Sequence, residues 1–162
     1  STDGEKVYSS CGIGIEVNSS IADERKALSG EHRPDMVLVC SGVYVEEFQN
    51  KTASAFLRET YNRGIAVGSL CTGAHLLAQA GLLNGKRCAI HWENLPGFSE
   101  AFPQAEVYAD LYEVDGNIYT CAGGTAPVSR RAMTRSSSLA VSAPSRIARK
   151  PGASNGLSLR WK

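Results

Sequence analysis

The chain has 162 residues, of which 43% are hydrophobic and 20% are charged, and its formal net charge at pH 7 is +1. This length suits one domain with its own core, and this composition is typical of ordinary globular proteins. No apolar run approaches the roughly 18 residues that a membrane-spanning helix needs, and the polar residues 1–6 do not form a secretory signal peptide. We therefore expect a cytoplasmic protein without a membrane partner.

The five cysteines are an odd number and include no Cys-x-x-Cys pair. Cys40, Cys88 and Cys121 lie in apolar runs, where a reduced and buried thiol is the ordinary expectation. This usage indicates a reducing cytosol and argues against a metal site. We expect neither a metal ion nor another cofactor.

The first half of the chain contains predicted strands and one clear helix. Residues 7–17 alternate loosely around two glycines, which indicates a strand pair or a bent strand. The apolar run 36–40, ended by Ser41-Gly42, is typical of a strand buried on both faces of a parallel sheet. Apolar side chains at helical spacing predict a helix over 48–61, and Asn62-Arg63-Gly64 has the composition of a C-terminal cap.

The next elements alternate in the same way. Residues 65–70 predict a second buried strand, which turns at 71–73 directly into a helix over 74–80. Residues 87–92 predict a strand, and the segment after it predicts a short helix over 93–102 that Pro96-Gly97 interrupts. Further strands are predicted at 106–108, 111–114 and 117–122, the last two joined by the hairpin signal Asp115-Gly116. This rhythm predicts an α/β protein with a doubly wound sheet.

From Ala126 onward the regular pattern ends. Residues 126–162 contain eight basic residues and no acidic one, so the rest of the chain holds 17 − 8 = 9 basic and 16 acidic residues, a net charge of −7. Serine, arginine, alanine, proline and glycine dominate this segment, which cannot bury enough surface to offset its chain entropy. We interpret it as a basic, low-complexity tail that is disordered or read in a shifted frame, rather than as a nucleic-acid-binding arm.

Cys71 is the main candidate for chemistry. It follows a buried strand and opens a helix, at the edge where open α/β sheets bind ligands. A helix N-terminus favours a thiolate, so we expect a lowered pKa and the fastest alkylation among the five cysteines. Gly73 lets the backbone pass tightly behind a nucleophile, as in the elbow of α/β hydrolases, although Ser69 stands where that elbow has glycine. The alternative is that Cys71 is a small core residue at a helix start.

Other residues are expected near Cys71. Gly42, followed by Val43, could supply a second oxyanion N–H, although most strand-ending glycines only form turns. His91 ends a strand and could form a Cys–His pair, although a lone histidine there is more often structural. Trp92 is either a core residue or a pocket wall, and His75 is expected to pack or to form a hydrogen bond.

Short segments between residues 69 and 126 together form a combined motif. They are Ser69-Leu70-Cys71-Thr72-Gly73-Ala74, Leu77-Ala78, residues 80–87, His91-Trp92-Glu93-Asn94-Leu95, Phe98, Phe102-Pro103, Asp115-Gly116 and residues 120–126. This motif resembles the signature of the DJ-1/PfpI (class I glutamine amidotransferase-like) group, and specifically the branch fused to AraC-type DNA-binding domains. The resemblance covers residues 1–126.

The resemblance implies a flavodoxin-like, mostly parallel sheet with helices on both faces, from which the family's first strand and helix are missing here. It implies a homodimer and a ligand-sensing domain over 1–125 that binds a small metabolite, a quaternary amine or an amino acid. The expected ligand-binding residues are Gly42, Val43, Cys71, Thr72, His91 and Trp92. DNA would be contacted only through a helix-turn-helix domain that this chain does not contain. The amphipathic helix that the family has after Thr125-Ala126 is replaced by the basic tail.

Two alternatives stay open. The wider group includes isonitrile hydratases, whose cysteine turn and His-Trp pair are similar to this chain; Cys71 and His91 would then be catalytic. In such enzymes an acidic residue from the first strand-helix unit bonds the cysteine, and since this chain starts beyond that unit, the acid cannot be located in it. The third possibility is a structural domain with an inert cysteine. The better match of residues 93–126 to regulators favours a sensor over an enzyme.

Overall fold

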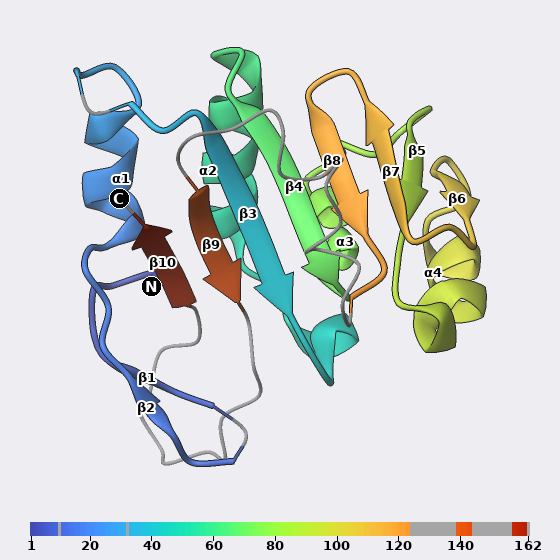
Figure 1. The fold of residues 1–162 in the computed structure, drawn as a ribbon, viewed down its shortest axis with the longest axis horizontal. Coiled ribbons are helices and arrows are strands. Elements are labelled where there is room, and N and C mark those ends of the chain that lie inside the picture. Colours follow the sequence, from blue (N-terminus) through green and yellow to red (C-terminus); the bar gives the residue numbers. More distant parts are fainter. Residues whose placement is uncertain (10, 32, 124–138, 144–156, 162) are drawn as a thin grey trace.

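A computed structural model describes residues 1–162 apart from 10, 32, 124–138, 144–156 and 162. Its main sheet has six strands in the order β10-β9-β3-β4-β8-β7 (Figure 1). The strands are β3 (Met36–Ser41), β4 (Ala66–Cys71), β7 (Tyr112–Asp115), β8 (Ile118–Cys121), β9 (Leu139–Ala143) and β10 (Leu157–Trp161). β9, β3, β4 and β8 are parallel to one another, whereas β7 and β10 are antiparallel edge strands. The predicted α/β class with a mostly parallel sheet is confirmed.

Two smaller sheets flank the main one. β1 (Val7–Tyr8) and β2 (Gly14–Ile15) form an antiparallel pair, which confirms the predicted strand pair. β5 (Arg87–Ala89) and β6 (Glu106–Tyr108) form a parallel pair of their own. Side chains of the β7–β8 hairpin hold β5: the Ala89 N–H donates to Thr120 Oγ1 at 2.8 Å, and Lys86 pairs with Asp115 at 2.8 Å.

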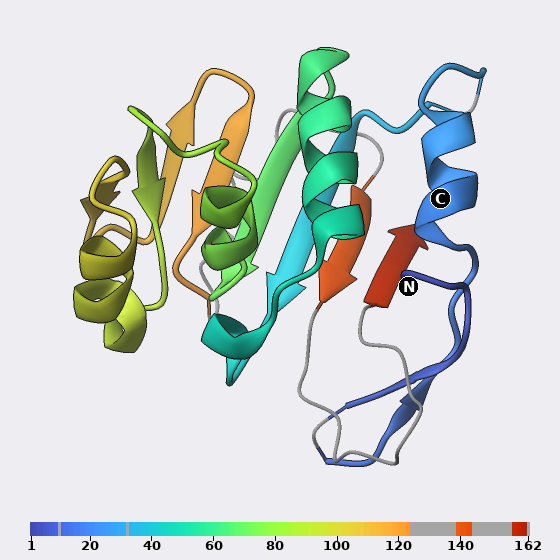
Figure 2. The same cartoon turned by 180° about the vertical axis from the view of Figure 1, so that it is seen from behind.

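The helices are α1 (Ile21–Ala27), α2 (Lys51–Asn62), α3 (Ala74–Gln79) and α4 (Leu95–Ala101), with 3-10 turns at Val45–Glu47 and Trp92–Asn94. Figures 1 and 2 show α2 and α3 on the same face of the sheet, behind the strands in one view and before them in the other. The second helical layer that we expected on the opposite face has no member in the described part of the chain.

Strand alternation divides the core between the two faces of the sheet. Val39, Val67 and Ile118 are fully buried in the larger cluster, which also contains residues of α2 and α3. Met36 and Leu38 belong to a second cluster with Cys40, Ala66 and Tyr119. Neighbouring strands therefore present their apolar side chains in register on both faces, as a parallel sheet requires.

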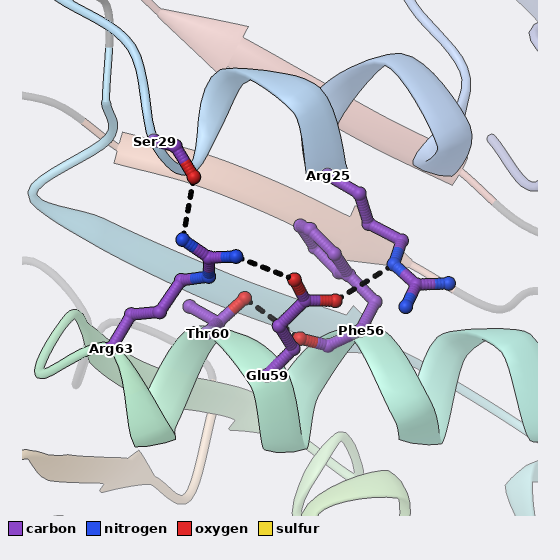
Figure 3. A network of polar contacts seen from close by, with 6 residues as sticks. All are labelled: Arg25, Ser29, Phe56, Glu59, Thr60 and Arg63. Carbon is purple, nitrogen blue, oxygen red and sulfur yellow. Dashed lines mark hydrogen bonds and ion pairs between the residues drawn. The ribbon is translucent and has the colours of Figure 1, made fainter.

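A polar network joins α1 to α2 (Figure 3). The Glu59 carboxylate accepts hydrogen bonds from Arg25 Nε at 2.8 Å and from the Arg63 guanidinium at 3.0 Å. Arg63 also donates to the Ser29 hydroxyl, beyond the end of α1. One carboxylate on α2 thus holds α1 beside it, while the burial of Ile21 in the shared core supplies the apolar contact.

Several details differ from the sequence-based predictions. α1 was not predicted, although Ser20 caps it by accepting the Asp23 N–H. Pro96 does not interrupt the helix after residue 93, because it lies in the first turn of α4, where no donor N–H is needed. The predicted strand over 87–92 ends at Ala89, and a 3-10 turn follows it.

The segment 126–162 contains two strands that we did not predict. The main chain of β9 pairs with β3 through Val37–Ala140, Leu38–Val141 and Val39–Ser142, and β10 pairs with β9. Such pairing joins residues about a hundred positions apart, so local composition gives no signal for it. The remaining residues of this segment lie outside the described part, and the interpretation as a disordered or frame-shifted tail stays a prediction. No helix in the described ranges is long and apolar enough to cross a membrane.

Candidate functional site

Cys71 is the last residue of β4, and α3 begins three residues later at Ala74. Its φ is +58°, so it adopts the left-handed region that costs an ordinary residue roughly 1 kcal/mol or more. Tyr44, in the loop after β3, is the other non-glycine residue with positive φ among those described. The predicted strained turn between strand and helix is therefore confirmed.

Gly73 makes this turn possible by its close approach to β3. A β-carbon at position 73 would lie under 3.0 Å from the carbonyl oxygen of Val39 and 3.1 Å from that of Leu70. The Gly73 N–H donates to the Leu70 carbonyl at 3.0 Å, which closes the turn. Only glycine fits here, as the sequence predicted.

The segments that follow three strands, β3, β5 and β8, meet at Cys71. After β3, the Gly42 carbonyl accepts a hydrogen bond from Thr72 Oγ1 at 2.5 Å. After β5, the His91 N–H donates to the Cys71 carbonyl at 3.4 Å. After β8, a β-carbon on Gly123 would lie 3.3 Å from Cys71 Sγ, so this loop packs on the thiol. Gly42, Thr72 and His91 thus lie together as expected, and Gly123 is a neighbour that the sequence analysis did not select.

Exposed apolar side chains surround this edge of the sheet. Val43 is 59% exposed, Tyr44 54%, Trp92 70% and Leu111 67%. Leu111 lies beside the loop after β8, because its carbonyl accepts the Ala122 N–H at 2.9 Å. Trp92 is therefore not a core residue. We call Val43, Tyr44, Trp92 and Leu111 the apolar rim.

Two carboxylates accompany the rim. Glu93 Oε2 lies 3.7 Å from His91 Nδ1. Glu46 Oε1 accepts a hydrogen bond from Asn94 Nδ2 at 3.0 Å, which links the loop after β3 to the turn after β5. The rim thus combines aromatic faces with negative charge, a combination that attracts cations.

The thiol of Cys71 does not have the lowered pKa that we expected. Burial raises its pKa above the ordinary value, the Glu93 carboxylate adds to this, and only one N–H, from Thr72, opposes them. α3 has only six residues, and its first N–H groups bond within the turn, from His75 to Thr72 and from Leu76 to Gly73. The expectation of a helix-activated thiolate is wrong because desolvation outweighs the weak field of a short helix.

Cys11 should be alkylated before Cys71. Its exposed thiol is bonded to the Ser9 hydroxyl at 3.0 Å, and this contact together with the Ile13 N–H lowers its pKa. Since the thiolate is the nucleophile, limited iodoacetamide treatment at pH 7.5 should label Cys11 about tenfold faster, as peptide mapping by mass spectrometry would measure. Ser9→Ala should slow Cys11 alone. Faster labelling of Cys71 would contradict the burial argument.

His75, in the first turn of α3, packs as predicted. It is 4% exposed, and its ring meets Phe98 edge-on with centroids 4.9 Å apart and Phe102 with centroids 5.7 Å apart. Its Nε2 has no hydrogen-bond partner. Burial lowers the pKa of His75, although the Glu46 carboxylate opposes this. The folded chain therefore favours the neutral imidazole.

Acidification should weaken the fold through His75. The pKa is lower in the folded chain than the value of about 6.5 in the unfolded one, so the unfolded state takes up the proton first. The contribution of His75 to the free energy of unfolding is complete above about pH 6.5 and declines as the pH falls below this value. The melting temperature of His75→Leu should therefore fall less between pH 7.5 and 5 than that of the native chain. His91→Leu is the matched control; equal slopes in native and His75→Leu chains would refute this assignment.

An α/β sheet with a cysteine at a strained strand-to-helix turn defines a flavodoxin-like protein of the nucleophile-elbow type. The family model of the DJ-1/PfpI family matches residues 1–133, and the chain belongs to this family. Within the described ranges, no group of three or more His, Cys, Asp or Glu side chains is placed to hold a metal ion.

Three comparisons show which members are similar. The HTH-type transcriptional regulator GbdR of Pseudomonas aeruginosa is 37% identical over 128 residues, which are 79% of this chain and 33% of the regulator. An AraC family transcriptional regulator from Pseudomonas putida has a crystal structure that superposes with a TM-score of 0.57 at 28% identity, covering 75% of this chain and 62% of that one. The isonitrile hydratase of Pseudomonas putida is 32% identical over 97 residues, covering 58% of this chain and 41% of the enzyme. The chain thus spans about a third of the curated regulator that it matches.

Proposed function

We propose that this chain is the effector-sensing, dimerising domain of an AraC-family transcriptional regulator. The relatives named as HTH-type regulators are longer than this chain, and the chain aligns with 33% of GbdR and 36% of the regulator CdhR. DNA would be bound by a helix-turn-helix domain of the complete protein, which would act in the cytoplasm as a homodimer.

The main support for the proposal is that the strained turn at Cys71 and the apolar rim lie at the same edge of the sheet. Binding pockets of α/β proteins lie at this edge of the sheet, and ligands are held by apolar walls with a few placed polar groups. Trp92 and Tyr44 offer aromatic faces, and Glu46 and Glu93 offer negative charge. A quaternary amine or a basic amino acid has the chemistry to use both, through cation–π contact and charge attraction. Gly42, Val43, Thr72 and His91 would complete the site.

Two observations favour binding over catalysis. The raised pKa of Cys71 leaves little thiolate at neutral pH, whereas a cysteine that turns over a substrate as its nucleophile needs a large thiolate fraction. His91 meets Cys71 through its main-chain N–H, while its imidazole lies beside Glu93 and Trp92. A ligand could bind against this thiol without a reaction.

An isonitrile-hydrating enzyme is the second candidate, because one protein that is similar to this chain is an isonitrile hydratase. In that case Cys71 would be the nucleophile and His91 its base. The rim would then guide a substrate rather than hold an effector.

Calorimetry with the complete reading frame should separate the two candidates. With a panel of quaternary amines and basic amino acids, we expect one ligand to bind without being consumed and Cys71→Ser to keep its affinity within about threefold. Trp92→Ala should lose about tenfold or more, the size of one partly desolvated cation–π contact. Tyr8→Ala, an exposed aromatic on β1, is the matched control. If the native protein hydrates an isonitrile and Cys71→Ser does not, the enzyme replaces the sensor.

A further inference from the structure

Three thiols lie on adjacent strands at the edge that carries the site. Cys40 is on β3, Cys71 ends β4 and Cys121 ends β8. Cys40 and Cys121 are both paired in register with Leu70, the residue before Cys71. Each is therefore a diagonal neighbour of Cys71. From the spacing of parallel strands, the Cα atoms of such neighbours are about 6 Å apart. This is within the range of roughly 4.4–6.8 Å that a disulfide spans.

Gly123 brings the thiols of Cys71 and Cys121 to the same place. In a regular strand, consecutive side chains alternate between faces, but the positive φ of Cys71 ends this alternation. The side chain of Cys71 instead packs on Gly123, where an added β-carbon would lie 3.1 Å from Cys71 Cβ and 3.3 Å from its Sγ. The N–H of the same glycine bonds to the Cys121 thiol. Both sulfur atoms thus contact one residue that has no side chain to separate them.

The environment of the thiols favours Cys121 over Cys40 as the partner. Burial, with the neighbouring Cys71 and Cys121, raises the pKa of Cys40 to about 12. The pKa of Cys121 is also raised by burial and by Cys71, but the Gly123 N–H stabilises its thiolate. Cys88 is buried, and its pKa is raised by burial and by Glu113 rather than by another thiol.

We propose that Cys71 and Cys121 form a reversible disulfide when the protein meets a hydroperoxide. Cys71 is the more accessible of the two thiols, so hydroperoxide reaches it first. Because its pKa is raised, only a small thiolate fraction reacts, and the reaction needs excess peroxide. This thiolate attacks one peroxide oxygen, the O–O bond breaks, and a sulfenic acid and water (or an alcohol) are formed. The Cys121 sulfur then displaces the hydroxyl, which leaves as a second water with the Cys121 proton. Two thiols are oxidised and one peroxide is reduced; a small dithiol restores both by exchange.

The bridge would act on the site at which the effector is proposed to bind. It would fix the loop after β8 to the turn after β4 and remove the free thiol from the pocket wall. The site would then take its ligand only in the reduced state. The formation of the disulfide itself does not depend on any ligand, so it can be tested whether or not the sensor proposal holds.

Peptide mapping of the whole chain tests the proposal. A Cys11→Ser background removes the more reactive surface thiol. The protein is exposed to hydrogen peroxide, alkylated in denaturant and digested with trypsin, without a reducing agent. Cleavage after residues 63, 86, 87 and 130 leaves Cys71 in the peptide 64–86 and Cys121 in the peptide 88–130 with Cys88. We expect these two peptides to be joined, with the mass of two hydrogens lost, and to separate with dithiothreitol.

Variants assign the bond. Cys121→Ser should abolish the joined species, while Cys88→Ser and Cys40→Ser should leave it unchanged. Fragmentation of the joined peptides in the Cys11→Ser parent identifies the bonded sulfurs directly, so a variant that fails to fold does not decide the matter. A bond from Cys71 to Cys40 or Cys88, or oxidation of Cys71 to a sulfinic acid with Cys121 still free, would overturn the proposal.

Discussion

Replacing Gly73 with alanine should destabilise the chain by about 3 kcal/mol or more, a large part of the roughly 5–15 kcal/mol that stabilises a typical domain. The added methyl group would meet the main-chain oxygen of Val39, which is fixed in the buried strand β3 and cannot rotate away. β3 or the turn itself would have to move. Urea unfolding followed by circular dichroism would measure the loss.

Gly97→Ala is the matched control. Gly97 lies inside α4, and nothing would come within 4 Å of a β-carbon there. Alanine is the better helix former, so this variant should be more stable by about 0.5–1 kcal/mol. The two substitutions add the same methyl group, with opposite expected signs. A Gly73→Ala chain as stable as the native one would show that the strand and the turn do not touch.

Phe98→Ala should cost about 3–5 kcal/mol, because Phe98 is completely buried and its removal leaves a cavity between α3 and α4. The loss includes its edge-on contact with His75 and its contact with Phe102, whose ring centroid lies 5.0 Å away. The melting temperature and the urea midpoint should both fall. We also expect the pH dependence assigned to His75 to weaken, since water can enter beside the imidazole.

Trp92→Ala is the control for this second prediction. It removes a larger ring from the turn just before α4, but that ring is 70% exposed. The free energy of unfolding should change by no more than about 0.5 kcal/mol. Trp92 should therefore matter for ligand affinity and Phe98 for stability. Similar losses from both variants would contradict the placement of Trp92 on the surface.

Four strands of the main sheet, β3, β4, β7 and β8, could be predicted from the sequence because each depends on a local signal. The apolar runs before Ser41 and Cys71 are β3 and β4, and the cap at Gly64 ends α2, with a φ of +72°. The hairpin between β7 and β8 was also predicted. Its register pairs Asp115 with Ile118, so the two loop residues are Gly116 and Asn117, one position later than the Asp-Gly signal indicated. The turn at Cys71 followed from small residues at the end of an apolar run.

What could not be predicted depends on contacts between distant segments. The pKa of Cys71 is set by burial under several loops, one of which contains Gly123, and no local rule gives its sign. β9 is found through its pairing with β3, and the apolar rim through the exposure of Trp92 and Leu111 in the folded chain. α1 was missed because its seven residues bury only Ile21 and Glu24, too few to give a helical period.

The hydrogen bond from the Thr72 hydroxyl to the Gly42 carbonyl has a mechanical consequence. It joins the loop that carries Val43 and Tyr44 to the turn from which α3 starts, so we expect the two segments to move together. A molecule that displaces the first segment must also move the second, or break this partly buried hydrogen bond. Movement of this turn would then be transmitted through α3 to α2, which contacts it on the same face of the sheet (Figure 2). Thr72→Val keeps the size of the side chain but removes its hydroxyl, so it would break this link between the two segments.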